Sequence, residues 1–358
     1  MRTADEPIIS ADDHMDLNVL PPRLFVDRLP ARLRDAAPRV VDTPDGPVWH
    51  VDGRLLGPSG RKAKGLIVHE EHGFRPGQPE HRLADMDRDR VYTQVIYGPP
   101  GGIAVPDVEV RTCCLQAYND WADEFNAVDR DRLVVLALLP GDTPEAASTE
   151  LRRAADLGHK GALVGLFESD VPLFEEPWET FWATADEVGL PIHFHLGGGL
   201  HSLKGRPNSW RQPAMVAVVP MQLDEALSGM VFSGLLERHP NVNLVLGESG
   251  LGWVPYVLER MDHEHDKYGP LVEDVRLPLP PSEYVRRQVY FSYEEDRVGL
   301  EMIPRIGATN VMWASDYPHG DSTWPNSRTA IDESGLAVQL TEVDYLAARV
   351  VALLLSRS

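Results

Sequence analysis

Four short segments of this chain place acidic or histidine side chains where an apolar run ends. The segments are SADDHMD at 10–16, PIHFHLGGG at 191–199, LVLGESG at 244–250 and VMWASDYPH at 311–319. Buried strands of a parallel sheet consist of short apolar runs, and their carboxyl ends meet at one edge, where sites form. Carboxylates and imidazoles bind divalent ions such as zinc and manganese. The recurrence therefore predicts one mononuclear metal centre.

The first segment offers two competing ligand pairs. Side chains alternate along a strand, so Asp12 and His14 share one face and Asp13 lies on the other. Asp16 continues the alternation, which makes His14 with Asp16 the alternative to Asp12 with His14. Acidic residues that cap a following helix would explain the same segment without a metal.

The second segment carries a pair of histidines. His193 and His195 share one face of the expected strand, and both point into a barrel if Ile192 and Phe194 face the surrounding helices. A single buried histidine is more often a hydrogen-bonded core residue than a ligand, but two of them at a strand end before three glycines favour a site. We expect His195, nearer the end of the strand, to bind metal and His193 to contact substrate.

The last two segments supply carboxylates. Asp316 follows an apolar run and can bind metal or take a proton from bound water, although an Asx turn before Pro318 would also explain it. Glu248 stands at the equivalent place in a glycine-rich turn, where the alternative is an ordinary helix cap. His319 would orient Asp316 or contact substrate, or else lie in a surface loop.

Composition excludes several classes of partner. The chain has 358 residues, 43% of them hydrophobic and 25% charged, which is ordinary for a globular protein and fits one large domain. A formal net charge of −21 argues against nucleic acid and anionic membranes, because both need a basic face. Cys113 and Cys114 are adjacent, so they suit neither a disulfide nor a zinc knuckle. With no leader-like start and no 18-residue apolar stretch, we expect a cytoplasmic enzyme with a small-molecule substrate.

Short β-like runs alternate with longer amphipathic stretches, which predicts an α/β fold, a (β/α)8 TIM barrel. The expected strands are 8–11, 93–96, 133–138, 162–165, 191–195, 243–246, 289–292 and 311–313. The expected helices are 80–90, 108–127, 144–157, 178–188, 221–238, 253–267, 299–306 and 342–355. Eight strands are the number that closes such a barrel.

Two segments interrupt the alternation. The first, about 38–77, contains a β-like run in which Trp49 and Val51 share a face, and it predicts a β-hairpin inserted after the first strand. The second, about 197–220, is glycine-rich and irregular. Both would lie at the catalytic end of the barrel as a lid or substrate wall, or form a dimer contact; Trp49 and Trp210 suit either role if exposed.

Taken together, the segments resemble the amidohydrolase superfamily, specifically the branch related to aminocarboxymuconate-semialdehyde decarboxylase. The resemblance spans essentially the whole chain and is most specific in NVMWASDYPHGDSTWP at 310–325, which is similar to that branch's strand-eight signature with Asp316 as ligand. LPIHFHLGG at 190–198 matches the strand-five histidine at His195. The resemblance, with the inserted hairpin, implies a homodimer. Two further segments are similar to family sequences: RLADMDRDRVYTQVIY at 82–97 and ERHPNVNLVLGESGLGWVPYVLERMD at 237–262.

Two departures from the family pattern bear on the reaction. Many members carry His-x-His on strand one and some decarboxylases carry Glu-x-His, whereas this chain has Asp12 followed by His14. Where a family histidine commonly activates the metal-bound water, this chain has Glu248. A carboxylate can act as a general base, but its charge lowers the affinity for an anionic substrate.

These observations predict one divalent ion, most readily zinc with manganese as the alternative, and an open position for water. Asp316 or Glu248 would accept a proton from that water, with His319 beside them. The expected ligands of the ion are Asp12, His14, His195 and Asp316.

We therefore expect a metal-dependent hydrolase acting on a small carboxylate, amide or lactone. The first alternative is a metal-dependent nonoxidative decarboxylase. The second is a degenerate barrel with a binding or accessory biosynthetic role. Tyr97, which precedes a Pro-Pro-Gly-Gly turn, and Arg211 are further candidates for substrate contact.

Overall fold

Parallel strands form the centre of the molecule. The computed structural model describes residues 7–60, 73–99, 103–166, 169–197, 203, 209–320 and 322–334 of the 358. One parallel run has the order β1 (Ile8–His14), β5 (Val91–Tyr97) and β6 (Leu133–Val135). The other has the order β7 (Ala137–Leu138), β8 (Ala162–Leu163), β9 (Ile192–His195), β10 (Leu244–Gly247), β11 (Val289–Tyr293) and β12 (Val311–Trp313).

The two runs join at both ends into a closed barrel. Leu136 connects β6 to β7 without leaving the strand direction, and its N–H donates to the carbonyl of Ile96 at 2.9 Å. At the other seam the N–H of Asp316, just beyond β12, donates to the carbonyl of Asp12 on β1 at 3.0 Å. With β6 and β7 counted as one strand, the described residues contain eight barrel strands. The predicted (β/α)8 barrel is therefore confirmed.

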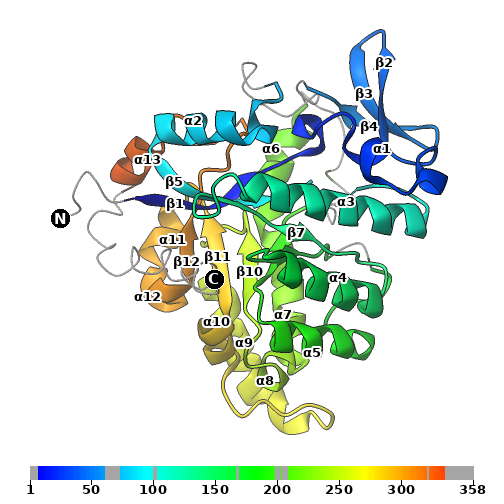
Figure 1. Ribbon diagram of the computed structural model, residues 1–358. Helices are drawn as coiled ribbons and strands as arrows, with labels where there is room; N and C mark the ends of the chain where they lie inside the picture. Colours follow the sequence, from blue (N-terminus) through cyan, green and yellow to red (C-terminus); the bar gives the residue numbers. More distant parts are fainter. Residues whose placement is uncertain are drawn as a thin grey trace.

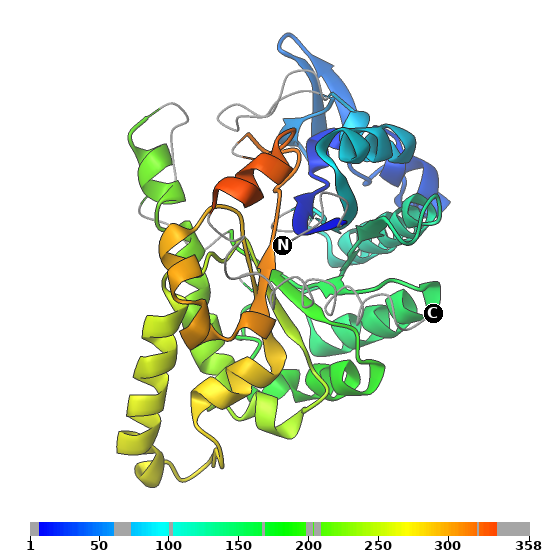
Figure 2. The ribbon, with the colours of Figure 1, turned by 90° about the vertical axis from the view of Figure 1, so that its left-hand side faces the viewer.

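Helices surround the strands (Figures 1 and 2). Most expected helices form, but 221–238 breaks at Gly234, whose φ of +75° ends one helix, and 299–306 divides at Met302. The expected helix 342–355 lies outside the described residues. The helices that follow the barrel strands are α2 (Pro79–Asp89), α3 (Val108–Asn126), α4 (Pro144–Leu157), α5 (Glu179–Val188), α7 (Asp224–Phe232), α8 (Leu235–Arg238), α9 (Val254–Tyr268), α10 (Pro281–Gln288), α11 (Arg297–Glu301), α12 (Ile303–Ile306) and α13 (Ser327–Glu333).

The apolar core lies between the strands and the helices. Ile192 and Phe194 of β9 are completely buried there, and Phe194 lies near Trp182 of α5. Because side chains alternate along a strand, the intervening His193 and His195 point into the barrel, as the sequence predicted. The core shell thus fixes the direction of the polar side chains that build the site.

The segment inserted after β1 is larger than the expected hairpin. It forms a three-stranded antiparallel sheet of β2 (Arg39–Thr43), β3 (Gly46–Val51) and β4 (Arg54–Pro58), shown at the top of Figure 1. The second turn, at Asp52 and Gly53, takes positive φ values and allows the chain to reverse again. Trp49 is fully buried against Phe25 of α1 (Leu24–Arg28) rather than exposed, so it belongs to the core of the insertion. Residues 61–72 lie outside the described part.

The second expected loop is partly helical. Of 197–220, the structure describes Gly197, Leu203 and the residues from Ser209 onward, which include α6 (Arg211–Val216) and the start of a 3-10 turn (Val219–Leu223). Trp210 precedes α6 and is 67% exposed. It therefore remains available for an interface or a substrate wall, unlike Trp49.

One stretch, Arg211–Phe232, has the length and apolar composition of a membrane span, with a mean hydropathy of 1.3 and 28% of the window buried. Its helical backbone is broken between α6 and α7, and Asp224 and Glu225 lie within it. Such a stretch is weak evidence for membrane insertion, because core helices of globular proteins have the same composition.

Candidate metal centre

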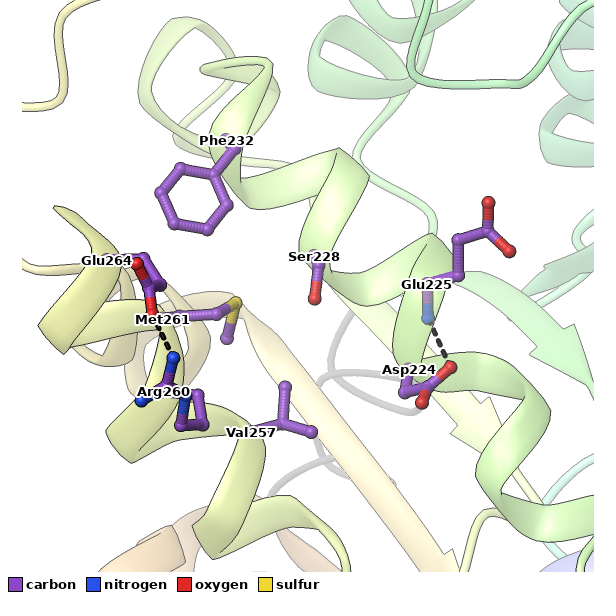
Figure 3. Close-up of a pocket in the computed structure, with 8 residues that line it drawn as sticks. All are labelled: Asp224, Glu225, Ser228, Phe232, Val257, Arg260, Met261 and Glu264. Atoms are coloured by element: carbon purple, nitrogen blue, oxygen red, sulfur yellow. Dashed lines mark hydrogen bonds and ion pairs between the residues drawn. The ribbon is translucent and has the colours of Figure 1, made fainter. Parts of the chain in front are cut away.

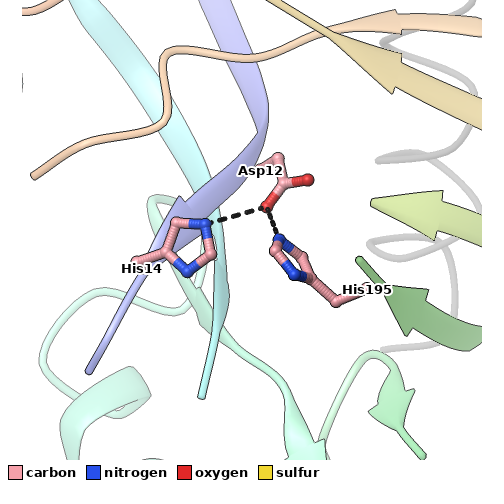
Figure 4. Close-up of side chains that lie close together, drawn as sticks. All are labelled: Asp12, His14 and His195. Carbon is pink, nitrogen blue, oxygen red and sulfur yellow. Dashed lines mark ion pairs between the residues drawn. The ribbon is translucent and has the colours of Figure 1, made fainter. Parts of the chain in front are cut away.

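Three of the expected ligands converge at the carboxyl end of the barrel (Figure 4). Asp12 Oδ1 lies 3.7 Å from His14 Nε2 and 3.7 Å from His195 Nε2. The fourth, Asp316, brings its Oδ1 to 2.9 Å from His14 Nε2. Each of these four side chains is at most 5% exposed. Residues separated by about 300 positions in the sequence thus meet because β1, β9 and β12 end at the same edge.

The atoms that face one another in this cluster lack hydrogen bonds. Asp12 Oδ1, His14 Nε2, His195 Nε2 and Asp316 Oδ1 are all buried, and each has no hydrogen-bond partner in the described structure. Unsatisfied buried polar atoms cost about 1–3 kcal/mol each, so four of them in one cluster need an explanation. Two groups of ligand atoms lie close enough together to hold a metal ion: Asp12, His14 and His195 form one, and His14, Asp316 and His319 form the other, with His14 common to both. Two carboxylates and two imidazoles are a suitable ligand set for zinc or manganese.

The carboxylate of Asp12 is held in place by its second oxygen. Asp12 Oδ2 accepts the backbone N–H of Glu248 at 2.6 Å and the hydroxyl of Ser292 at 2.9 Å. A Cβ atom on Gly247 would lie 2.9 Å from both Asp12 Oδ2 and His195 Cδ2, so only glycine leaves room there. These contacts leave Oδ1 as the atom that faces the two imidazoles.

Asp316 and Glu248 share an unusual backbone conformation. Their φ angles are +56° and +49°, in the left-handed region that L-residues other than glycine seldom adopt. Such strain costs on the order of 1–3 kcal/mol and is concentrated at functional sites. Both residues follow a barrel strand, and the conformation turns their side chains toward the cluster.

Glu248 is the most open carboxylate of the cluster. Its Oε2 lies 3.3 Å from His195 Nε2, and its side chain is 28% exposed, against 2% for Asp12 and Asp316. Burial, together with the negative charge of Asp316, raises the pKa of Glu248 to about 8. Burial opposes a charge on His195, but the carboxylates of Asp12 and Glu248 outweigh it and raise the pKa of His195 to about 9. The carboxylates of the cluster therefore attract positive charge.

His319 connects two acidic residues. Its Nδ1 lies 3.1 Å from Asp316 Oδ2, its Nε2 lies 3.0 Å from Asp16 Oδ2, and its ring stacks on His14 at 4.0 Å between centroids. Burial alone would lower the pKa of His319, but the charges of Asp316 and Asp16 raise it well above the usual value. The structure thus places His319 where it can orient Asp316. It places Asp16 nearest to His319, and Asp16 Oδ1 lies 3.9 Å from His14 Nδ1.

His193 and Tyr97 are buried next to the cluster. Both side chains are at most 1% exposed, and Tyr97 Oη lies 2.8 Å from His193 Nδ1. Burial lowers the pKa of His193 to about 3, so its imidazole is neutral. The Tyr97 ring lies 5.2 Å from the ring of His195. Their expected role as substrate contacts stays a prediction, and their side chains are enclosed in the barrel interior.

Arg211 begins α6, and its guanidinium lies 4.8 Å from the ring of the exposed Trp210. This position is on the long segment between β9 and α7 and not on a barrel strand. Arg211 thus remains a candidate for substrate contact if the segment between β9 and α7 forms part of the substrate pocket.

A groove lies between α7 and α9, and its lining includes none of the cluster residues (Figure 3). It has a volume of about 340 Å³ and lies on the outer, helical layer. Arg260 there forms an ion pair with Glu264, and the described lining contains no histidine. Its lining residues are Asp224, Glu225, Ser228, Phe232, Val257, Arg260, Met261 and Glu264. The volume of a cavity therefore does not identify the candidate catalytic site of this protein.

Comparison with known proteins identifies the family. The sequence profile described as amidohydrolase matches residues 44–344. This chain belongs to the amidohydrolase family. It is 26% identical to gamma-resorcylate decarboxylase of Rhizobium radiobacter over 337 residues, which cover 79% of this chain and 98% of that protein. It is 25% identical to 2-amino-3-carboxymuconate-6-semialdehyde decarboxylase of Dictyostelium discoideum over 245 residues, covering 67% and 66%.

Solved structures share the fold over nearly the full length. An amidohydrolase from Mycobacterium avium subsp. paratuberculosis superposes with a TM-score of 0.79 at 19% identity, covering 98% of this chain and 100% of that chain. A dihydroxybenzoic acid decarboxylase from Polaromonas sp. JS666, solved with manganese and 2-nitroresorcinol, superposes with a TM-score of 0.66 at 18% identity, covering 98% of both chains. The candidate ligands of this chain are consistent with a single divalent ion.

These relatives correct the predicted reaction. The sequence analysis favoured hydrolysis because Glu248 stands where the family commonly has a histidine. The named relatives are decarboxylases, so the hydrolase prediction is wrong and the decarboxylase alternative is better supported. The error came from treating one residue as decisive, although a carboxyl group can handle a proton in either reaction. The resemblance to the aminocarboxymuconate-semialdehyde decarboxylase branch is confirmed.

Proposed function

We propose that this protein is a metal-dependent nonoxidative decarboxylase that acts on a small aromatic or similarly unsaturated carboxylate. The convergence of four buried, unpartnered ligand atoms at the carboxyl end of the barrel carries the proposal. The relatives named for gamma-resorcylate and aminocarboxymuconate semialdehyde support the reaction and the substrate class. In this reaction the bond between the ring carbon and the carboxylate breaks, carbon dioxide leaves, and a proton takes its place.

Asp12, His14, His195 and Asp316 would hold the ion. When bound, a divalent ion supplies a Lewis acid that binds and polarises an oxygen of the substrate. Zinc and manganese both suit two carboxylates and two imidazoles, and the manganese-containing neighbour supports manganese at least as strongly as zinc. The ligands themselves are almost completely enclosed, which keeps bulk water away from the side of the site that they form.

Glu248 is the group placed to deliver the proton to carbon. It lies beside His195, and its partly exposed carboxyl group can exchange protons with solvent between turnovers. The charge of a carboxylate would repel the substrate anion, so the neutral acid is the form that accepts substrate and then donates. His319, between Asp16 and Asp316, holds the Asp316 carboxylate and adds positive charge near the substrate anion.

The reaction is tested by measuring both products. Purified protein loaded with manganese or zinc is incubated with 2,6-dihydroxybenzoate and related hydroxybenzoates, and carbon dioxide and the ring product are quantified. We expect equal amounts of both, loss of activity with a chelator, and recovery when the ion is restored. Cleavage of lactones or amides by metal-loaded protein, with no carbon dioxide from any carboxylate of the panel, would contradict the proposal.

Glu248 is tested with a matched pair of variants. Glu248→Gln keeps the size of the side chain but cannot donate an acidic proton, so we expect turnover to fall by about 100-fold or more. Glu248→His supplies another group that can carry a proton and should retain more activity than the glutamine variant. Equal activity of the glutamine variant and the wild type would remove Glu248 from the proton transfer.

A homodimer in the cytoplasm remains part of the proposal. Native mass measurement of the purified chain tests the dimer, and the exposed Trp210 gives a residue whose fluorescence would report burial at an interface. A monomer at micromolar concentration would contradict this part while leaving the reaction untouched.

A further inference from the structure

Asp13 lies on the opposite face of β1 from Asp12 and His14, and it reaches the loop that carries Asp316. Its side chain is completely buried. Asp13 Oδ1 accepts the hydroxyl of Ser315 at 2.5 Å and the backbone N–H of Tyr317 at 3.0 Å. The two partners are the residues immediately before and after Asp316, so one carboxylate oxygen binds both neighbours of a proposed metal ligand.

Arg82 of α2 holds the same loop from another direction. Its guanidinium is completely buried and lies 5.0 Å from the centre of the Tyr317 ring. Arg82 Nη1 donates to the carbonyl of His14 at 2.9 Å, and Nη2 lies 3.5 Å from the carbonyl of Tyr317. The His14 N–H in turn donates to the Tyr317 carbonyl at 2.7 Å. Hydrogen bonds therefore connect the backbone of β1 at His14 to the loop after β12 at Tyr317, next to Asp316.

The charge of Arg82 acts on the buried Asp13 carboxyl group. Burial alone strongly disfavours the ionised carboxylate, and it raises the pKa of Asp13 well above its usual value, while the positive charge of Arg82 opposes that effect. Asp13 Oδ2 has no hydrogen-bond partner in the described structure. Both residues are completely buried, and both bind the loop that carries Asp316.

We infer that Asp13 is a positioning residue of the metal centre, which holds Asp316 in its left-handed conformation by binding Ser315 and Tyr317, with Arg82 as its counter-charge. Asp316 has a φ of +56°, a conformation that persists only when the surroundings fix it. Hydrogen bonds on both sides of the residue supply that restraint. The inference rests on the proposed metal site and not on the proposed reaction.

A purely structural role for Asp13 predicts a different result from a positioning role. Asp13→Asn keeps an oxygen that can accept both hydrogen bonds, but it removes the charge opposite Arg82. Asp13→Ala removes the hydrogen bonds and the charge together. Ser315→Ala removes one hydrogen bond and leaves the charge. Loss of the charge should lower stability, whereas loss of the hydrogen bonds should release Asp316.

The experiment measures ion binding by the full-length apoprotein, without substrate. Manganese or cobalt is titrated well below the unfolding temperature of each variant, and thermal unfolding of the apoproteins is recorded alongside. We expect Asp13→Ala to raise the Kd for the ion by about 10- to 100-fold and Ser315→Ala by about 5-fold. Asp13→Asn should unfold at a lower temperature yet bind within about 3-fold of the wild type. The visible spectrum of bound cobalt should change in the alanine variants and not in Asp13→Asn.

The outcomes separate the hypotheses. Wild-type affinity and spectrum in both alanine variants, with a lower unfolding temperature, would overturn the positioning role and leave only a structural one. If Asp13→Ala does not fold, Ser315→Ala decides the matter alone. A wild-type protein that binds no ion would reject the metal site itself, and with it this inference. Failure of decarboxylation with normal ion binding would affect only the proposed function.

Discussion

Two regions of the molecule gather carboxylates: the carboxyl end of the barrel and the groove between α7 and α9. In the barrel, Asp12 and Asp316 are each 2% exposed and have oxygens without hydrogen bonds. In the groove, Glu225 is exposed and Glu264 has an ion-pair partner in Arg260. Water can solvate the groove carboxylates, so nothing there requires a cation. The difference shows that unmet buried ligand atoms, rather than the number of acidic residues or the volume, mark the candidate site.

The strongest test of this difference is to remove one charge from the barrel cluster. Asp316→Asn keeps the shape of the side chain but loses the anionic oxygen that faces His14. We expect turnover to fall by at least about 1,000-fold because a ligand of the ion is lost, while the protein still folds. Turnover is measured as carbon dioxide release. Asp224→Asn in the groove is the matched control and should retain full turnover.

A smaller effect should follow from filling the space behind the ligands. In Gly247→Ala, the added Cβ would approach Asp12 Oδ2 and His195 Cδ2 to 2.9 Å, so the two ligands must move apart. We expect the Kd for manganese to rise by about 100-fold. Gly252→Ala is the control, because its nearest neighbour would be Asp296 at 3.5 Å, an ordinary contact. Equal affinities of the two variants would show that the ligand geometry is not tightly specified.

Asp89 sharpens the comparison because it is a buried carboxylate whose oxygens are satisfied. It accepts the N–H and the hydroxyl of Ser327 at 2.9 and 2.5 Å, and burial raises its pKa to about 6. Since the folded-state pKa lies above the unfolded value, the folded protein binds more protons between pH 4 and pH 6. Its contribution to stability is therefore complete below pH 4 and is lost as the pH rises through 6.

Asp89→Asn removes this titration. The unfolding free energy of the variant minus that of the wild type should rise by about 2 kcal/mol from pH 4 to pH 7, as measured by denaturant unfolding at each pH. Ion affinity at pH 7 should not change. If the difference in unfolding free energy stays constant across this pH range, Asp89 has the same pKa in the folded and unfolded protein. If the variant loses ion binding, a buried carboxylate can affect the metal site even when its oxygens have hydrogen bonds.

The smallest effect is expected in the groove. Glu264→Gln removes the ion pair with Arg260, whose side chain is 50% exposed. Exposed pairs contribute less than about 1 kcal/mol, so the unfolding free energy should change by no more than about 0.5 kcal/mol and turnover by less than 2-fold. A large loss of turnover would show that the groove affects catalysis in the barrel, which contradicts the comparison.

Sequence reasoning located the barrel and the residues of the cluster because both depend on local patterns. Apolar runs identify buried strands, and the residue that follows each run lies at the carboxyl end. His195 and Asp316 were found in this way. The helix α10 was missed because its proline-rich start reads as a loop, although Pro281 at the first turn is favourable.

The residues that support the cluster were not predictable in the same way. Ser292 binds Asp12 across 280 positions of sequence, and Ser315 binds Asp13 across 302. No local period or motif reveals such a partner, since it depends on which strands become neighbours when the barrel closes. The contact between Tyr97 and His193 spans 96 positions and was not predictable for the same reason.

The most direct test of the account is a crystal structure of the full chain grown with manganese, in which anomalous scattering locates the ion. We expect one site per chain, bonded to Asp12, His14, His195 and Asp316 at about 2.0–2.3 Å, and no site between α7 and α9. Ion density only in that groove, or an empty barrel cluster in protein that binds manganese in solution, would contradict the account.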